Sequence, residues 1–109
     1  MATTYKVLGQ SDPAITTATT LYTCPASTQT VISTIVVCNR GAASGTYRIS
    51  IRPNGATQAD EHYIVFDTVA AAVSTTAYTL GLTIDAADVV TVYSSTSDFS
   101  FNAFGSEIA

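Results

Sequence analysis

The segment Tyr47-Arg48-Ile49-Ser50-Ile51-Arg52 decides the fold class, because apolar and polar residues alternate through it without interruption. Successive side chains of a β-strand point to opposite faces, so the pattern places the tyrosine and the two isoleucines on a core face. Arg48 and Arg52 share the opposite face. That face is then either solvated or paired with acids of a partner, where the arginines would fix register more than they would add affinity.

Further strands are expected on both sides of this segment. Residues 98–104 alternate similarly until Phe104, so Phe99 and Phe101 should be buried together. Residues 31–38 are β-branched and apolar on both faces, which predicts a central strand covered on each side, with another subunit as one candidate cover. Shorter strands are expected at residues 5–8, 20–23, 63–66, 77–80 and 89–93.

Short strands separated by turn residues predict an all-β fold, a single β-sandwich of about eight strands. The pattern leaves open whether the topology is jelly-roll or Ig-like. Residues 68–74 include three consecutive alanines, but the flanking β-branched residues favour a loop over a helical turn. A length of 109 residues suits one domain, because two cores would leave each half too small.

The N-terminal segment is expected to behave as an arm. Residues 1–15 hold one short strand followed by the Gly9–Pro13 stretch, and residues 16–109 form the sandwich domain. The arm's strand can pair within its own sheet or lie on a neighbouring subunit, since an open sheet edge accepts either. Both arrangements remain open from the sequence.

Composition restricts the partners. Eight acidic side chains against four basic ones give a net charge of −4 without a basic run, so nucleic acid is not expected. No apolar run approaches the length of a membrane span and the first residues lack the pattern of a signal peptide, so no membrane is expected and the chain is expected to be made in a cytoplasm.

The low charged fraction of 11% is itself informative, because isolated soluble domains usually carry about twice as much. Ser, Thr and Ala replace the charges, and such a surface is less costly to desolvate in protein contacts. The alternative is an exposed β protein whose strands are rich in threonine because threonine favours strands.

Candidate chemical sites are sparse. Cys24 and Cys38 are expected to be small buried side chains; a disulfide between them is possible only if their strands pair, and zinc would need two more ligands. His62 is the only histidine, and Asp60-Glu61-His62 is expected to be an exposed loop end rather than part of a triad. Asp85 and Asp88 match no calcium loop and are expected to cap a turn.

The sequence also lacks a nucleophile elbow, a dinucleotide fingerprint and a phosphate loop. We therefore expect no enzyme, and no catalytic, cofactor-binding or metal-binding residues.

Four phrases of the sequence resemble small virion structural proteins of tailed bacteriophages, including cyanophages. They are residues 7–11 (VLGQS), 19–26 (TTLYTCPA), 33–40 (STIVVCNR) and 99–108 (FSFNAFGSEI). The resemblance spans nearly the whole chain and implies a β-sandwich that oligomerises on a capsid, tail or baseplate. It implies no catalytic residues.

Within that class we expect a capsid decoration (cement) protein, located in the virion, that stabilises the head shell. Its partners would be further copies of itself, with a trimer as one candidate, and the major capsid protein or another virion protein. The expected subunit or capsid contacts are Tyr5, Val7, Arg48, Arg52 and Tyr93, with tyrosine favoured because it is common at interfaces. The alternative is a tail, baseplate or fibre component.

Overall fold

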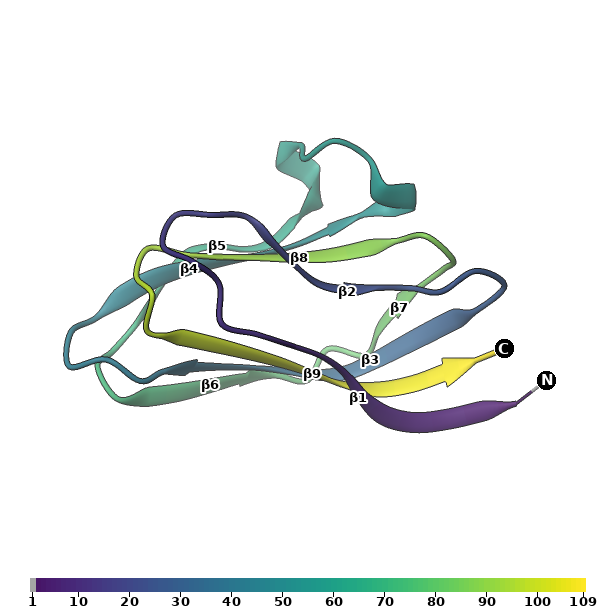
Figure 1. Ribbon diagram of the computed structural model, residues 1–109, viewed down its shortest axis with the longest axis horizontal. Helices are drawn as coiled ribbons and strands as arrows, with labels where there is room; N and C mark the ends of the chain where they lie inside the picture. The colour runs from purple at the N-terminus through teal and green to yellow at the C-terminus, as the bar shows by residue number, and fades with distance from the viewer. Residues whose placement is uncertain (1) are drawn as a thin grey trace.

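The computed structural model describes residues 2–109, which form two antiparallel β-sheets packed face to face (Figure 1). Sheet A has the strand order β1-β9-β3-β6, with β7 also paired to β3, and sheet B has the order β2-β8-β4-β5. The strands are β1 (Thr3–Ser11), β2 (Thr19–Thr23), β3 (Gln29–Asn39), β4 (Gly45–Arg52), β5 (Tyr63–Ala70), β6 (Ser74–Tyr78), β7 (Leu82–Ile84), β8 (Val89–Ser94) and β9 (Phe99–Ile108). The predicted all-β sandwich is confirmed.

The core lies between the sheets and contains the residues that alternation predicted. Tyr47 and Ile49 of β4 are almost fully buried, and Ile51 packs at the edge of the same cluster. Phe99 and Phe101 of β9 are both fully buried, with ring centroids 6.4 Å apart. The two decisive strands therefore face each other across the sandwich, one from each sheet.

Strand β3 is central in sheet A, as its apolar sequence predicted, because it pairs with β9 on one side and with β6 and β7 on the other. Its inner residues, including Ile35 and Val37, are buried. The outer residues Val31, Val36 and Cys38 are only half-buried. Cover on both faces was predicted, and the single chain covers one.

The edge of sheet A opposite β1 differs from the prediction. A strand was expected at residues 77–80, but β6 is Ser74–Tyr78, and a turn with Val73 at φ 49° precedes it. The loop predicted at residues 68–74 is confined to residues 71–73, because β5 continues to Ala70 and β6 begins at Ser74; no helical turn forms there. The three-residue strand β7 was not predicted, which makes nine strands rather than about eight.

The N-terminal strand β1 pairs with β9 of the same chain from Thr3 to Ser11, so it extends further than the expected short strand. It also lies close to β2. A Cβ atom on Gly9 would come 2.0 Å from the carbonyl oxygen of Leu21, so only glycine permits this approach. The single chain thus shows pairing within the sheet, and exchange of the arm between subunits stays a prediction.

Candidate functional site

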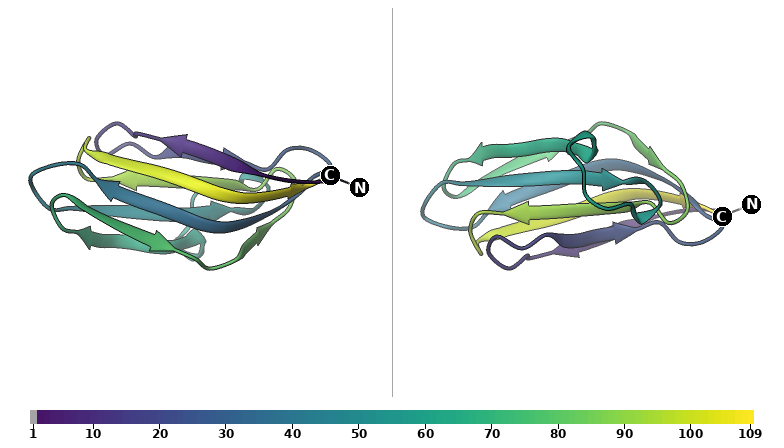
Figure 2. Two further views of the ribbon diagram at one scale, coloured as in Figure 1. Left: turned by 90° about the horizontal axis from the view of Figure 1, so that it is seen from below. Right: turned by 90° about the horizontal axis from the view of Figure 1, so that it is seen from above.

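The five residues expected to make subunit or capsid contacts fall on opposite sides of the sandwich. Tyr5 and Val7 lie on the outer face of sheet A, whereas Arg48, Arg52 and Tyr93 lie on the outer face of sheet B. Figure 2 views these two faces from below and from above. The two groups therefore belong to two separate surfaces, which differ in chemistry.

The outer face of sheet A has no charged side chain among the strand residues that point outward. Strand register arranges these residues in rows across β1, β9, β3 and the β6–β7 edge. Three rows are complete: Tyr5, Ser106, Val31 and Thr83; Val7, Phe104, Thr34 and Thr79; and Gln10, Asn102, Val36 and Ala77. We call these rows the charge-free face.

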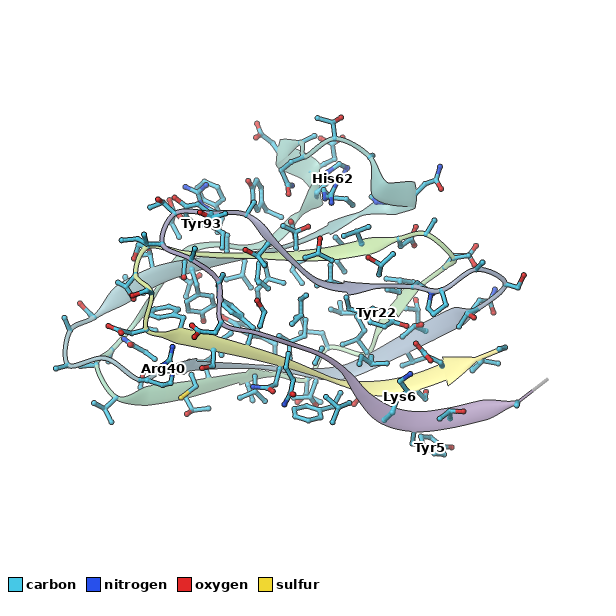
Figure 3. All side chains as sticks on the ribbon, in the orientation of Figure 1. Tyr5, Lys6, Tyr22, Arg40, His62 and Tyr93 are labelled. Atoms are coloured by element: carbon cyan, nitrogen blue, oxygen red, sulfur yellow. The ribbon has the colours of Figure 1, made fainter. Side chains whose placement is uncertain are left out.

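Large apolar side chains of this face are exposed to solvent in the single chain. Tyr5 is 84% exposed, Val7 48% and Phe104 37%. Figure 3 shows Tyr5 projecting from sheet A away from the rest of the molecule. A contiguous exposed apolar surface on a small domain is typical of a contact with another protein.

The expected contact residues did not include Phe104, Thr34 and Val36, although residues 31–38 were expected to be covered on both faces, with another subunit as one candidate cover. The signal was present for Phe104, because Asn102, Phe104 and Ser106 continue the alternation that buries Phe99 and Phe101. That alternation places a phenylalanine on the outside. The other members could not be grouped with it before the pairing of β9 with β3 was known.

The outer face of sheet B carries charge, but its charged groups are paired within the chain. The Arg48 guanidinium lies between two aromatic rings, 4.3 Å from the centroid of Phe66 and 4.4 Å from that of Tyr93. Its Nε and one terminal nitrogen donate to Asp67 at 2.6 and 3.2 Å. The hydrogen bond from Arg48 lowers the pKa of the Asp67 carboxyl and raises that of the guanidinium.

Arg52 is satisfied in the same way. It donates to the hydroxyl of Thr91 at 3.1 Å and to the backbone carbonyls of Gly55 and Ala56 at 3.3 and 2.8 Å. A partner's acids are thus not needed to satisfy either arginine. Beside Arg48 is a pocket of about 250 Å³ whose lining includes Tyr63 and Gln58.

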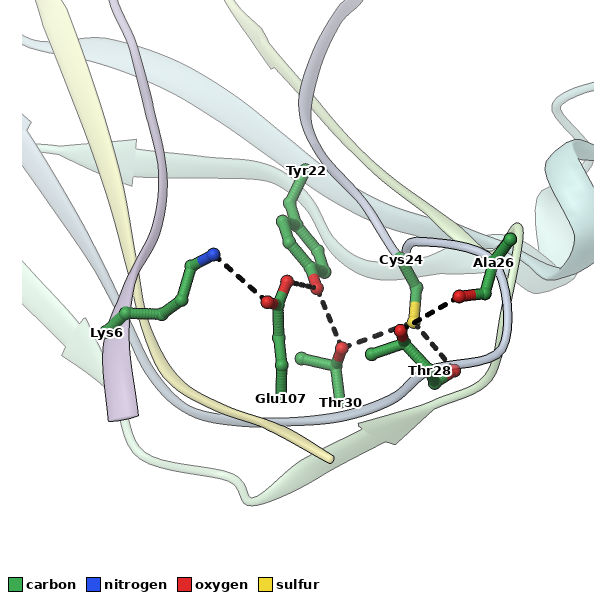
Figure 4. Close-up of polar contacts among 7 residues, drawn as sticks. All are labelled: Lys6, Tyr22, Cys24, Ala26, Thr28, Thr30 and Glu107. Atoms are coloured by element: carbon green, nitrogen blue, oxygen red, sulfur yellow. Dashed lines mark hydrogen bonds and ion pairs between the residues drawn. The ribbon is translucent and has the colours of Figure 1, made fainter. Parts of the chain in front are cut away.

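A polar network closes one end of the sandwich between the two sheets (Figure 4). Glu107 of β9 accepts from Lys6 of β1 at 3.0 Å and from the hydroxyl of Tyr22 of β2 at 2.5 Å. Because the Tyr22 hydroxyl donates to Glu107, it accepts from the Thr30 hydroxyl at 2.7 Å. The Cys24 thiol lies 3.2 Å from the same Thr30 oxygen.

The network shifts the pKa values of its tyrosine and of its carboxyl group in opposite directions. Burial, and then the hydrogen bond to Glu107, raise the pKa of Tyr22. The hydrogen bonds from Tyr22 and Lys6 lower the pKa of Glu107. The network links strands β1, β2, β3 and β9.

The Asp60-Glu61-His62 cluster lies in a short 3-10 turn directly before β5, where the sequence predicted the end of a loop. The His62 Nδ1 atom accepts the Ala59 backbone N–H at 3.0 Å, so this histidine orders its own turn. Figure 3 places His62 and Tyr22 in different parts of the molecule.

The two aspartates of the turn before β8 cap backbone N–H groups, as predicted. Asp88 accepts from the N–H groups of Asn54 and Asp85, each at 2.8 Å, and Asp85 accepts from Ala86 at 2.8 Å. Within residues 2–109, no three His, Cys, Asp or Glu side chains gather as metal ligands would.

The two cysteines are unpaired; Cys24 directly follows the end of β2, and Cys38 lies on β3. Cys24 is buried, as predicted, whereas Cys38 is half-buried on the outer side of β3. The strands that would have to pair for a disulfide do not pair.

Comparison with known proteins finds no matching family model, and no match among curated proteins or solved structures. No helix within the described part of the chain is long and apolar enough to cross a membrane.

Proposed function

We propose that this chain is a non-catalytic structural subunit of a tailed-phage virion, and specifically a capsid decoration (cement) protein that stabilises the head shell. In this proposal it is made in the host cytoplasm and resides in the virion. Its partners are other proteins, namely further copies of itself and the major capsid protein or another virion protein.

The observation that carries an assembly role is the charge-free face. A domain that works alone usually covers its exposed sheet face with charged side chains, which keep it soluble and discourage association. Here the outer face of a complete sheet has none, and Tyr5 and Phe104 stand exposed on it. Burial of that face against protein removes the apolar area from water at little cost, because hydroxyl groups are easier to desolvate than charges.

The mechanism of a cement subunit is physical. A subunit that buries surface on two neighbouring shell proteins adds its contact energy to the work of separating them. A standard interface of about 1,600 Å² in total is sufficient for one specific contact.

The virion part of the proposal is supported by the resemblance of the four quoted sequence phrases to small phage structural proteins. The runner-up is a tail, baseplate or fibre component of the same kind of particle. An adhesive fibre tip would favour aromatic residues in exposed loops, and residues 41–45 and 55–59 contain none. A hydrolytic enzyme is the least favoured class, because the sequence shows no pair of catalytic carboxylates in a recognisable setting.

Cryo-electron microscopy of the intact particle tests this function. Density of the size of this sandwich, repeated over the outer shell, is the expected result. Density confined to the tail or its base would replace decoration with the runner-up. Absence of the chain from purified particles, checked by mass spectrometry, would overturn the virion proposal.

A further inference from the structure

We propose that the charge-free face is the self-association surface of this protein and is covered by a second copy of the same chain. This inference rests on the assembly role proposed above and deepens it by naming the partner of one surface. The shell would then be contacted through other parts of the sandwich.

Charge is the first argument. Two copies each carry a net charge of −4, so contacts between charged surfaces tend to bring like charges together. The outer face of sheet B presents Arg48, Arg52 and Asp67. When two charge-free faces meet, no charged side chains are brought together. Of the two outer sheet faces, this one therefore self-associates without electrostatic repulsion.

Size is the second argument. The molecule measures 45 × 27 × 20 Å along its principal axes, and Figure 2 looks along the intermediate axis, so the face of sheet A lies within a molecular outline of 45 by 20 Å. A standard specific interface buries about 800 Å² on each partner. A sheet face within this outline is thus comparable in size to the area that each partner of a specific dimer buries.

The third argument is that the face is complementary to itself. Its largest side chains, Tyr5, Val7 and Phe104, lie on β1 and β9, while the β6–β7 edge presents Thr79 and Thr83. A two-fold axis parallel to the strands brings β1 of one copy over the β6–β7 edge of the other. Val7 then lies opposite Thr79 and Tyr5 opposite Thr83, so that large side chains meet smaller ones in a self-complementary contact.

Sedimentation of the purified full chain tests the proposal with three variants of equal charge. Thr34→Lys and Ala77→Lys put a lysine on the charge-free face. Thr20→Lys puts the same charge on an exposed position of β2 in sheet B and is the matched control. All three side chains point outward, and circular dichroism melts verify that each variant is folded.

The wild-type chain and Thr20→Lys should sediment as the same multiple of 11.3 kDa. Thr34→Lys and Ala77→Lys should dissociate, with association weakened on the order of 100-fold or more, because a lysine would be buried without an acid. A wild-type monomer at every concentration would overturn the self-contact, as would an oligomer that both face variants leave intact. Neither result depends on whether the chain is found in virions, so the two proposals fail separately.

Discussion

The outer faces of the two sheets differ in the side chains that they expose to solvent. Sheet B holds two arginines, and each is already engaged within the chain, Arg48 by Asp67 and two aromatic rings and Arg52 by Thr91 and backbone carbonyls. Sheet A turns its charged pair inward, where Lys6 meets Glu107. Its outer face keeps only neutral side chains, with Tyr5 almost fully exposed.

This difference between the two outer faces indicates which of them still has side chains free to contact another protein. A charged group that is paired within its own chain contributes little to a further contact, because the new contact would first have to disrupt the old one. Neutral hydroxyl and apolar groups have no such competitor. On this argument the face without charge is the better candidate for a contact surface, and contacts through Arg48 and Arg52 stay a prediction.

The largest expected effect is the loss of stability when an aspartate replaces a residue on the inner side of a sheet, compared with the same substitution on the outer side. Ile49→Asp should abolish cooperative folding, because it buries an uncompensated carboxylate at a position with no exposure, at a cost of about 4 kcal/mol or more. Val7→Asp introduces the same group at a 48% exposed site on the charge-free face and should leave the fold intact. Thermal melts followed by circular dichroism check both.

A native-like melt of Ile49→Asp would show that the facing of β4 is wrong. Unfolding of Val7→Asp would show that this part of the charge-free face belongs to the core of the single chain.

A smaller effect is expected at the inward charge pair of sheet A. Glu107→Gln should lower stability near neutral pH by about 1–2 kcal/mol, because it weakens the bonds to Tyr22 and Lys6. The folded pKa of Glu107 lies below its unfolded value. Its contribution is thus fully present above the unfolded pKa of about 4.5 and is lost as the pH falls through the folded value.

Urea unfolding at several pH values between 3 and 7 measures this contribution. The acid loss should be shallower in Glu107→Gln than in the wild type. Glu61→Gln is the matched control, since Glu61 is exposed in a turn and should leave the profile unchanged. Identical profiles for Glu107→Gln and the wild type would show that the network around Glu107 does not contribute to the pH dependence of stability.

The smallest effect is expected on the outer face of sheet B. Arg48→Ala should cost about 1 kcal/mol through the lost contacts with Phe66 and Tyr93. It should not change the oligomeric mass, which sedimentation can measure alongside the melt. Dissociation of the oligomer by Arg48→Ala at an unchanged fold would move the self-contact from sheet A to sheet B.

The sequence predicted the fold well wherever one strand alone carried the pattern. Alternation in β4 and β9 identified the core residues directly, because a period of two needs no knowledge of the neighbouring strand. Strand β7 escaped, since three residues are too few to display a period. β6 begins earlier than predicted because the chain turns at Val73. Val73 has a positive φ, which is rare for a β-branched residue, so the sequence did not predict the turn.

The candidate surface was less predictable because it depends on register. Tyr5 and Val7 were identified from their own strand, but only the pairing of β1 with β9 and of β9 with β3 brings Val7, Phe104 and Thr34 into one row. Likewise, no pattern in the sequence predicted the ion pair between Asp67 and Arg48. Contacts between strands distant in the chain determine both faces.

The most direct test of the central claim uses a thiol on the outer side of sheet A, in the row of side chains next to the charge-free face. Cys38 is half-buried on the outer side of β3, beside Thr75 and Ser100, whereas Cys24 is 1% exposed in the interior. The measurement is the rate at which N-ethylmaleimide alkylates Cys38 in native protein, followed by mass spectrometry below and above the association range. The account predicts that the rate falls as the oligomer forms, while the Thr34→Lys variant reacts equally fast at both concentrations. An oligomer in which Cys38 reacts as fast as in the dilute chain would contradict the claim that this face is the one that is covered.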